Sequence, residues 1–140
     1  MTILVRYASV VAMLLLLLGC ATGPKYSEVA ASLPKIASEK GRIYFYRVSV
    51  IGGAYQPDIS VNQNRVGSAK PKGVFYQDLA PGNYIVTTSM AQGKEVSLNL
   101  AAGEEKYVRL AYRFGFNVFP ELVDNDTGRQ EIQDLSFTQP

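Results

Sequence analysis

Cys20 holds the only thiol in the chain, and it lies at the end of an apolar N-terminal stretch. Arg6 is the one cation before it, the apolar run extends from Ala8 to Leu18, and Gly19 is small. A basic start, an apolar centre and a small residue form the layout of a secretory signal. The run is shorter than the roughly 20 residues that cross a hydrocarbon core of about 30 Å. With no second cysteine for an internal disulfide, the Cys20 thiol is available for modification.

The sequence Leu17-Leu18-Gly19-Cys20 resembles the lipobox of bacterial lipoproteins, in which the cysteine receives a diacylglycerol before the leader is removed. The resemblance implies a signal peptide with a signal helix over residues 1–19 and a lipid-anchored protein after it. Two or more acyl chains hold a protein stably on a membrane. Ala21 occupies the position where Asp commonly retains Gram-negative lipoproteins in the inner membrane. The resemblance therefore favours the outer membrane, facing the periplasm, over the inner membrane.

Few residues are suited to catalysis. The chain has no histidine, which excludes a histidine-based triad or metal site, and a lipidated cysteine cannot act as a nucleophile. Residues 124–128 are similar to a calcium loop, but the glycine comes one position early and Leu135 replaces the bidentate glutamate, which favours a polar turn. Glu104 and Glu105 are neighbours that would point to opposite faces of a strand, so they cannot readily flank one glycosidic bond. We expect no enzyme, no catalytic residue, no metal and no cofactor.

One predicted strand carries side chains suited to binding. Tyr107, Arg109 and Arg113 fall at alternate positions and point the same way, and Arg47 is a candidate neighbour. Because aromatic residues and arginines are over-represented at interface hot spots, this face could bind an envelope protein or a cell-wall polymer. An ordinary solvated face with snorkelling arginines has the same pattern. The sequence leaves both interpretations open.

The charge of the chain is nearly balanced. It has 14 Lys and Arg residues against 12 Asp and Glu residues, a net charge of +2. No run of like charges indicates a nucleic-acid surface, so nucleic acid is not expected among the partners.

Residues 20–41 are predicted to form an acylated tether with a short helix. The apolar residues in it have the spacing of one helical face and end before a proline that stops the helix: Tyr26, Val29, Ala30 and Leu33, followed by Pro34. The polar face of this helix is not basic, which favours packing against the domain over lying on a membrane surface.

Residues 42–140 are predicted to form an all-β domain. Seven or eight short segments rich in β-branched and aromatic residues recur about every ten residues, which is typical of an antiparallel β-sandwich. They include 42–50, 59–61, 65–66, 74–79, 84–88, 96–100, 107–114 and 116–119, with Pro120 indicating an edge or a bulge. Residues 129–135 are ambiguous between a short helix and a strand.

The residue types predict two specific turns. Gln63-Asn64 is a plausible two-residue hairpin turn. Pro81 and Gly82 fit a type II turn in which Gly82 takes a positive φ, so that Gly82→Val would destabilise the domain. Tyr84 is then predicted to pack inward in the manner of a tyrosine corner.

The domain as a whole resembles the DUF2846 family of bacterial lipoproteins. The resemblance is carried by residues 41–47, by Val61-Asn62 and Val66-Gly67, by 73–76 and by 79–84, and residues 23–26 are similar to many members as well. It implies a transthyretin-like or carboxypeptidase-regulatory-like sandwich and no established activity.

These observations indicate a membrane-anchored envelope lipoprotein with a non-catalytic β-sandwich that binds another envelope component. An alternative is an accessory outer-membrane subunit of a secretion or envelope-spanning machine, which rests on fold analogy alone.

Overall fold

The computed structural model describes residues 21–140, so the predicted signal peptide and the predicted lipidation at Cys20 lie outside the described residues. No helix among residues 21–140 has the length and apolar character needed to span a membrane.

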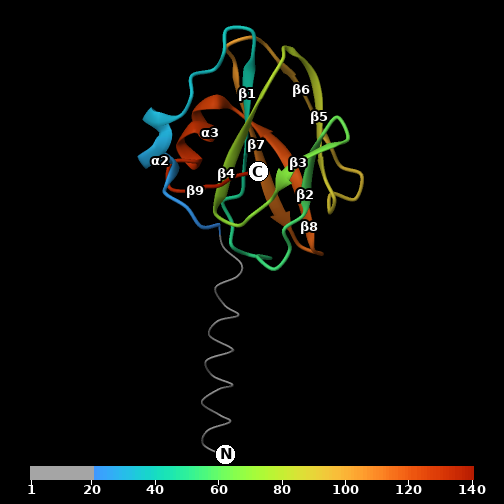
Figure 1. Ribbon diagram of the computed structural model, residues 1–140. Helices are drawn as coiled ribbons and strands as arrows, with labels where there is room; N and C mark the ends of the chain where they lie inside the picture. Colours follow the sequence, from blue (N-terminus) through green and yellow to red (C-terminus); the bar gives the residue numbers. More distant parts are fainter. Residues whose placement is uncertain (1–20) are drawn as a thin grey trace, which may run out of the picture.

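Two stacked β-sheets form the body of the protein (Figure 1). The first has the strand order β8-β7-β1-β4-β9 and the second β3-β2-β5-β6. The strands are β1 (Gly41–Tyr46), β2 (Asp58–Val61), β3 (Asn64–Ser68), β4 (Gly73–Leu79), β5 (Gly82–Thr88), β6 (Val96–Leu100), β7 (Glu105–Arg113), β8 (Asn117–Val123) and β9 (Ser136–Phe137). The all-β sandwich is therefore confirmed. Most pairs are antiparallel, while β1 pairs with β7, and β4 with β9, in parallel.

The core between the sheets is built from alternate strand residues. On β6, Val96, Leu98 and Leu100 face inward while the residues between them are exposed, as the alternation predicts. Strand β1 is buried along its whole length, because it lies between β7 and β4 and has both faces covered.

The outer face of the five-stranded sheet is also covered, in part by the short helix that the sequence predicted to pack against the domain and in part by a second helix that the sequence left undecided. Helices α2 (Tyr26–Val29) and α3 (Asn125–Glu131) lie over it, with the short 3₁₀ helix Ala30–Ser32 after α2 (Figure 1). Beneath them is a second apolar cluster rich in tyrosine: Tyr26, Tyr44, Tyr46, Val74, Tyr107, Ile132 and Leu135.

Residues 21–40 pack against the sandwich and do not form a free tether. The predicted short helix is confirmed, since α2 is followed by the 3₁₀ helix, which ends at Ser32 with Leu33 as its C-cap, just before Pro34. The backbone N–H of Ala21 donates to the carbonyl of Pro71 at 3.0 Å. The hydroxyls of Tyr26 and Tyr44 share a buried hydrogen bond of 2.9 Å.

Helix α3 replaces the polar turn predicted at residues 124–128 and resolves the ambiguity over 129–135. Asp124 caps it by accepting a 2.9 Å hydrogen bond from the backbone N–H of Thr127. That contact lowers the pKa of Asp124 below its ordinary value. Gly128 faces the sheet so closely that a Cβ there would collide with Tyr107.

Two predicted turns differ in detail. The first hairpin turn is Asn62-Gln63, one residue earlier than predicted, with positive φ at both residues, as a type I′ turn requires. Gly82 does not have a positive φ, because it is already the first residue of β5 and pairs with Leu100. The strain predicted for Gly82→Val is therefore wrong.

The tyrosine corner is confirmed. Tyr84 is half-buried against the sandwich core, and its hydroxyl donates to the carbonyl of Ala80 at 2.6 Å. The contact holds the entry to β5, as expected for a tyrosine that bonds a backbone carbonyl a few residues upstream.

The β7–β8 hairpin also corrects a prediction. The strand predicted over residues 107–114 ends one residue earlier, at Arg113, where the chain turns, and Phe114 is fully exposed. Gly115 and Phe116 have positive φ in this turn. The edge position predicted from Pro120 is confirmed, since β8 is the outermost strand of its sheet.

Candidate functional site

The four residues predicted to form one binding face are split between the interior and the surface. Arg109 and Arg113 reach the surface beside β8, whereas Tyr107 is 1% exposed and Arg47 is 0% exposed. The prediction of a shared exposed face is therefore wrong for Tyr107 and Arg47.

Tyr107 is a core residue of the outer cluster. Its ring stacks on Tyr44 at a centroid separation of 4.9 Å, and Gly128 of α3 lies against it. Its hydroxyl donates to Glu105 at 3.0 Å, and burial raises the pKa of Tyr107 above its ordinary value. A strand face is solvated only where nothing covers it, and this face is covered by α3, in a segment for which the sequence predicts a polar turn.

Arg47 is a buried clamp on the loops that follow β1 and β3. Its guanidinium donates to four backbone carbonyls, those of Ile51 at 2.7 Å, Gly52 at 3.0 Å, Tyr55 at 2.6 Å and Ala69 at 3.1 Å. Its Nε has no hydrogen-bond partner within the described residues. Burial lowers the pKa of Arg47, and the ring of acceptors compensates for the lost hydration of the cation.

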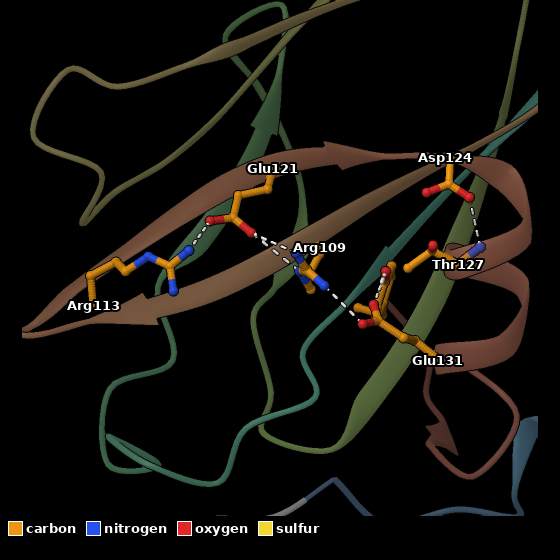
Figure 2. A network of polar contacts seen from close by, with 7 residues as sticks. Arg109, Arg113, Glu121, Asp124, Thr127 and Glu131 are labelled. Carbon is orange, nitrogen blue, oxygen red and sulfur yellow. Dashed lines mark hydrogen bonds and ion pairs between the residues drawn. The ribbon is translucent and has the colours of Figure 1, made fainter.

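The surface part of the predicted face is an acid–base network (Figure 2). Arg109 lies between Glu121 of β8, at 3.1 Å, and Glu131 of α3, at 2.8 Å. Arg113 donates to the other oxygen of Glu121, and the buried hydroxyl of Tyr46 donates to Glu131 at 2.5 Å. Two arginines and two glutamates carry no net charge together, so the network is not a free cationic surface.

Arg109 and Arg113 have different roles in this network. Burial alone lowers the pKa of Arg109, but its hydrogen bonds to Glu121 and Glu131 and their negative charges outweigh it and raise the pKa. Arg109 joins strand to helix. Arg113, whose side chain is 56% exposed, pairs only with Glu121 among residues 21–140, so it is the member that can exchange its partner for a ligand.

A shallow hollow of about 170 Å³ adjoins the network. Its walls include Val48, Ser49, Tyr112 and Arg113. Arg113 supplies a cation, the ring of Tyr112 a flat apolar surface and the hydroxyl of Ser49 a hydrogen-bonding group.

A larger hollow of about 350 Å³ lies between the N-terminal segment and the C-terminal residues. It is lined by Leu33, Pro34, Phe75, Tyr76, Phe137, Thr138, Gln139 and Pro140. Arg42 lies over the Tyr76 ring at 3.7 Å and pairs with Asp78 at 2.6 Å. Sequence reasoning missed this site, because it forms from segments distant in the chain; an arginine within an otherwise apolar strand was the available signal.

Glu104 and Glu105, the neighbouring carboxylates considered as a catalytic pair, each bind different partners. Glu104 accepts from the backbone N–H of Ala101 at 2.9 Å and pairs with Lys106 at 2.7 Å. Glu105 accepts from Tyr107 and Arg129. Among residues 21–140, no three His, Cys, Asp or Glu side chains lie close enough to hold a metal ion. Glu104 and Glu105 therefore form separate contacts and do not act as a pair.

Comparison with known proteins agrees with the family resemblance. The model of a protein family of unknown function, DUF2846, matches residues 37–121, more than half of the chain. An uncharacterised protein of Haemophilus influenzae is 28% identical over 138 residues, which cover 93% of this chain and 82% of that protein. The family match extends from before β1 into β8, so helices α2 and α3 lie outside it.

Proposed function

Because the chain belongs to the DUF2846 family, described only as of unknown function, we propose a function from its own residues. The protein is a membrane-anchored envelope lipoprotein whose β-sandwich binds another envelope component without catalysing a reaction. The outer membrane, on its periplasmic side, is the proposed location.

The observation that carries the proposal is the position of Cys20 relative to the folded domain. The thiol follows Leu17-Leu18-Gly19, and the next residue, Ala21, already makes a backbone hydrogen bond to the sandwich. Lipid on Cys20 would therefore hold the domain directly at a membrane, and two or more acyl chains make such an anchor stable.

Labelling with radioactive palmitate tests the anchor. The wild-type chain should incorporate label and Cys20→Ser should not. A matched control combines Cys20→Ser with Ser27→Cys, which restores one thiol at an exposed position outside the apolar leader. Incorporation into either variant would contradict acylation at Cys20.

The binding part of the proposal rests on Arg113 and the hollow beside it. Its guanidinium offers a planar fork that matches carboxylates and phosphates, and Tyr112 offers a rigid apolar plate. A ligand with an anionic group beside a flat group, on a protein or a wall polymer, fits this combination.

Crosslinking in intact cells tests the binding site. Arg113→Ser should lose the crosslinked partner, with stability nearly unchanged, because Arg113 is a surface residue. Arg65→Ser is the matched control, since its side chain is 57% exposed and also pairs with one acid, on the other sheet. Retention of every crosslink by Arg113→Ser, or equal loss in both variants, would place the binding site elsewhere.

A further inference from the structure

We propose that the end of the sandwich where Ala21 lies is a membrane-contact surface, in which two loops place apolar side chains among lipid headgroups. The loops are residues 47–57, after β1, and the β7–β8 hairpin, residues 113–117. This inference rests on the proposed acylation of Cys20 and goes beyond it, because an acyl anchor alone does not fix which face of a domain meets the membrane.

Among residues 21–140, the exposed large apolar side chains are concentrated in these two loops. Within residues 21–140, seven large apolar side chains are exposed: Val50, Ile51, Tyr55, Ile85, Phe114, Phe116 and Leu122. All except Ile85 and Leu122 belong to the two loops. Ile51 is 66% exposed and Phe116 is 57% exposed. Single exposed apolar residues need no explanation, whereas a group at one end marks a contact surface.

The two loops form one surface at the lower end of the molecule in Figure 1. Strands β1 and β7 are parallel, so the segments that follow them leave the sheet at the same end. The rings of Tyr55 and Phe116 contact each other with centroids 5.0 Å apart. Gly52 packs so closely on Tyr112 of β7 that a Cβ there would collide with its ring.

Arg47 makes this surface rigid. Three of its four carbonyl acceptors belong to Ile51, Gly52 and Tyr55, so a buried cation holds the first loop in the shape that presents Val50 and Ile51. Phe116 has a φ of 64°, a strained conformation for a bulky residue. Strain of this kind is typical of sites where function requires it.

The proposed anchor emerges at the same end. Ala21 is bonded to Pro71, and Pro71 lies beside Gly53 of the first loop. Adjacent Cα atoms are about 3.8 Å apart, so a lipid on Cys20 would be attached one residue from this end of the domain. A lipid on Cys20 brings this end, and no other, to the bilayer.

Charge in the loops suits an anionic membrane. Lys70 and Lys72 lie in the β3–β4 loop next to Pro71, and within residues 21–140 neither forms an ion pair. Residues 47–57, 69–73 and 113–117 contain no acidic residue. The β5–β6 loop at this end adds Lys94 and Glu95, which offset each other. Basic residues near anionic lipid each contribute about 1 kcal/mol, and apolar side chains beside them penetrate the headgroup region.

A fluorescent probe on the full chain tests the proposal. Lipidation converts the only thiol to a thioether, so a cysteine introduced at Phe114→Cys or Ile51→Cys is the single site for a thiol-reactive, environment-sensitive dye. Ala102→Cys is the matched control, exposed on the β6–β7 loop at the opposite end. Each protein is purified from membranes and reconstituted into vesicles of phosphatidylethanolamine and phosphatidylglycerol, and quenching by iodide is measured.

We expect quenching at positions 114 and 51 to fall several-fold relative to position 102, with a blue-shifted emission. Equal quenching at all three positions would overturn the proposal, and so would protection that disappears as the protein is diluted in lipid, since that would identify a second copy as the occupant. Dye uptake by the wild-type chain would show a free Cys20 thiol and overturn the proposed acylation as well. If the wild-type chain takes up no dye but the dye at position 114 is quenched as strongly as at position 102, only the membrane contact is overturned and the acylation of Cys20 stands.

Discussion

Arg47 shows how one side chain can fix a functional surface from beneath. A buried guanidinium with four carbonyl acceptors is tolerated because nearly all its donors are satisfied. A lysine would keep the charge but not the planar fork that reaches two loops at once.

We expect Arg47→Met to lower the free energy of unfolding by at least about 2 kcal/mol, because buried carbonyls left without donors each cost about 1–3 kcal/mol. Urea denaturation measures the loss. Arg65→Met, at an exposed arginine, should change stability by no more than about 0.5 kcal/mol. Equal effects of the two substitutions would mean that the clamp contributes nothing to the fold.

Gly128 offers a test in which two effects have opposite signs. Alanine is favoured over glycine in a helix by about 1 kcal/mol, but a Cβ at this position collides with the buried Tyr107. Overpacking of this kind costs about 1–3 kcal/mol, so we expect Gly128→Ala to lower the thermal midpoint. Gly82→Ala, where a Cβ meets nothing closer than 3.9 Å, should not lower it. A midpoint raised by Gly128→Ala would show that α3 is not held against Tyr107.

At the scale of elements, the inner core and the short N-terminal helix were predictable from the sequence, whereas helix α3 was not. Alternation identified β5, β6 and most of β7, because their inner faces pack on one opposing sheet. Helix α3 begins with Asn, Asp, Thr and Gly, residues of poor helix propensity, and its stability comes from packing that a local pattern does not contain. The spacing of Gly128, Ile132 and Leu135 was the signal available for this helix.

The same limit explains the errors in the binding site. Alternation correctly put Tyr107 and Arg109 on one face of β7, but it could not show that α3 covers the first and contacts the second through Glu131. The burial of Arg47, which follows β1, could not be predicted for a similar reason, since its partners are backbone carbonyls of two loops. The local sequence specifies the face of the strand on which a side chain lies. Whether that side chain is exposed depends on which other elements pack against that face.

The outer layer should make the protein sensitive to alkaline pH. Burial, with smaller contributions from neighbouring groups, raises the pKa of Tyr26, Tyr46 and Tyr107 above the ordinary value near 10. Above pH 10 the unfolded chain releases these protons while the folded chain keeps them, so stability present below that pH is lost as the pH rises. Each tyrosine contributes a slope of about 1.4 kcal/mol per pH unit.

Denaturation at several pH values from 9 upward measures this slope. Tyr107→Phe should make the decline shallower by the contribution of one tyrosine, because the raised pKa of Tyr107 is one of the three behind the slope. The same slope in wild type and Tyr107→Phe would contradict the inference that α3 seals this hydroxyl from solvent.

For the whole molecule, the anchor and the fold have one geometric consequence. Ala21, the residue after Cys20, is hydrogen-bonded to the domain, so a lipid on Cys20 would set not only the location of the sandwich but also its orientation. The loop end then faces lipid, and the hollow beside Arg113, on the side formed by β7 and β8, lies near the membrane surface. A partner bound there would be held close to the bilayer.

The intact mass of the chain purified from membranes tests the central claim most directly. We expect a polypeptide that begins at Cys20, lacks residues 1–19 and carries the added mass of a diacylglyceryl group, with or without a third acyl chain on its amine. Fragmentation should place the added mass on the first residue. An intact chain that still begins at Met1, or a chain with an unmodified Cys20, would contradict the membrane-anchored lipoprotein that we propose.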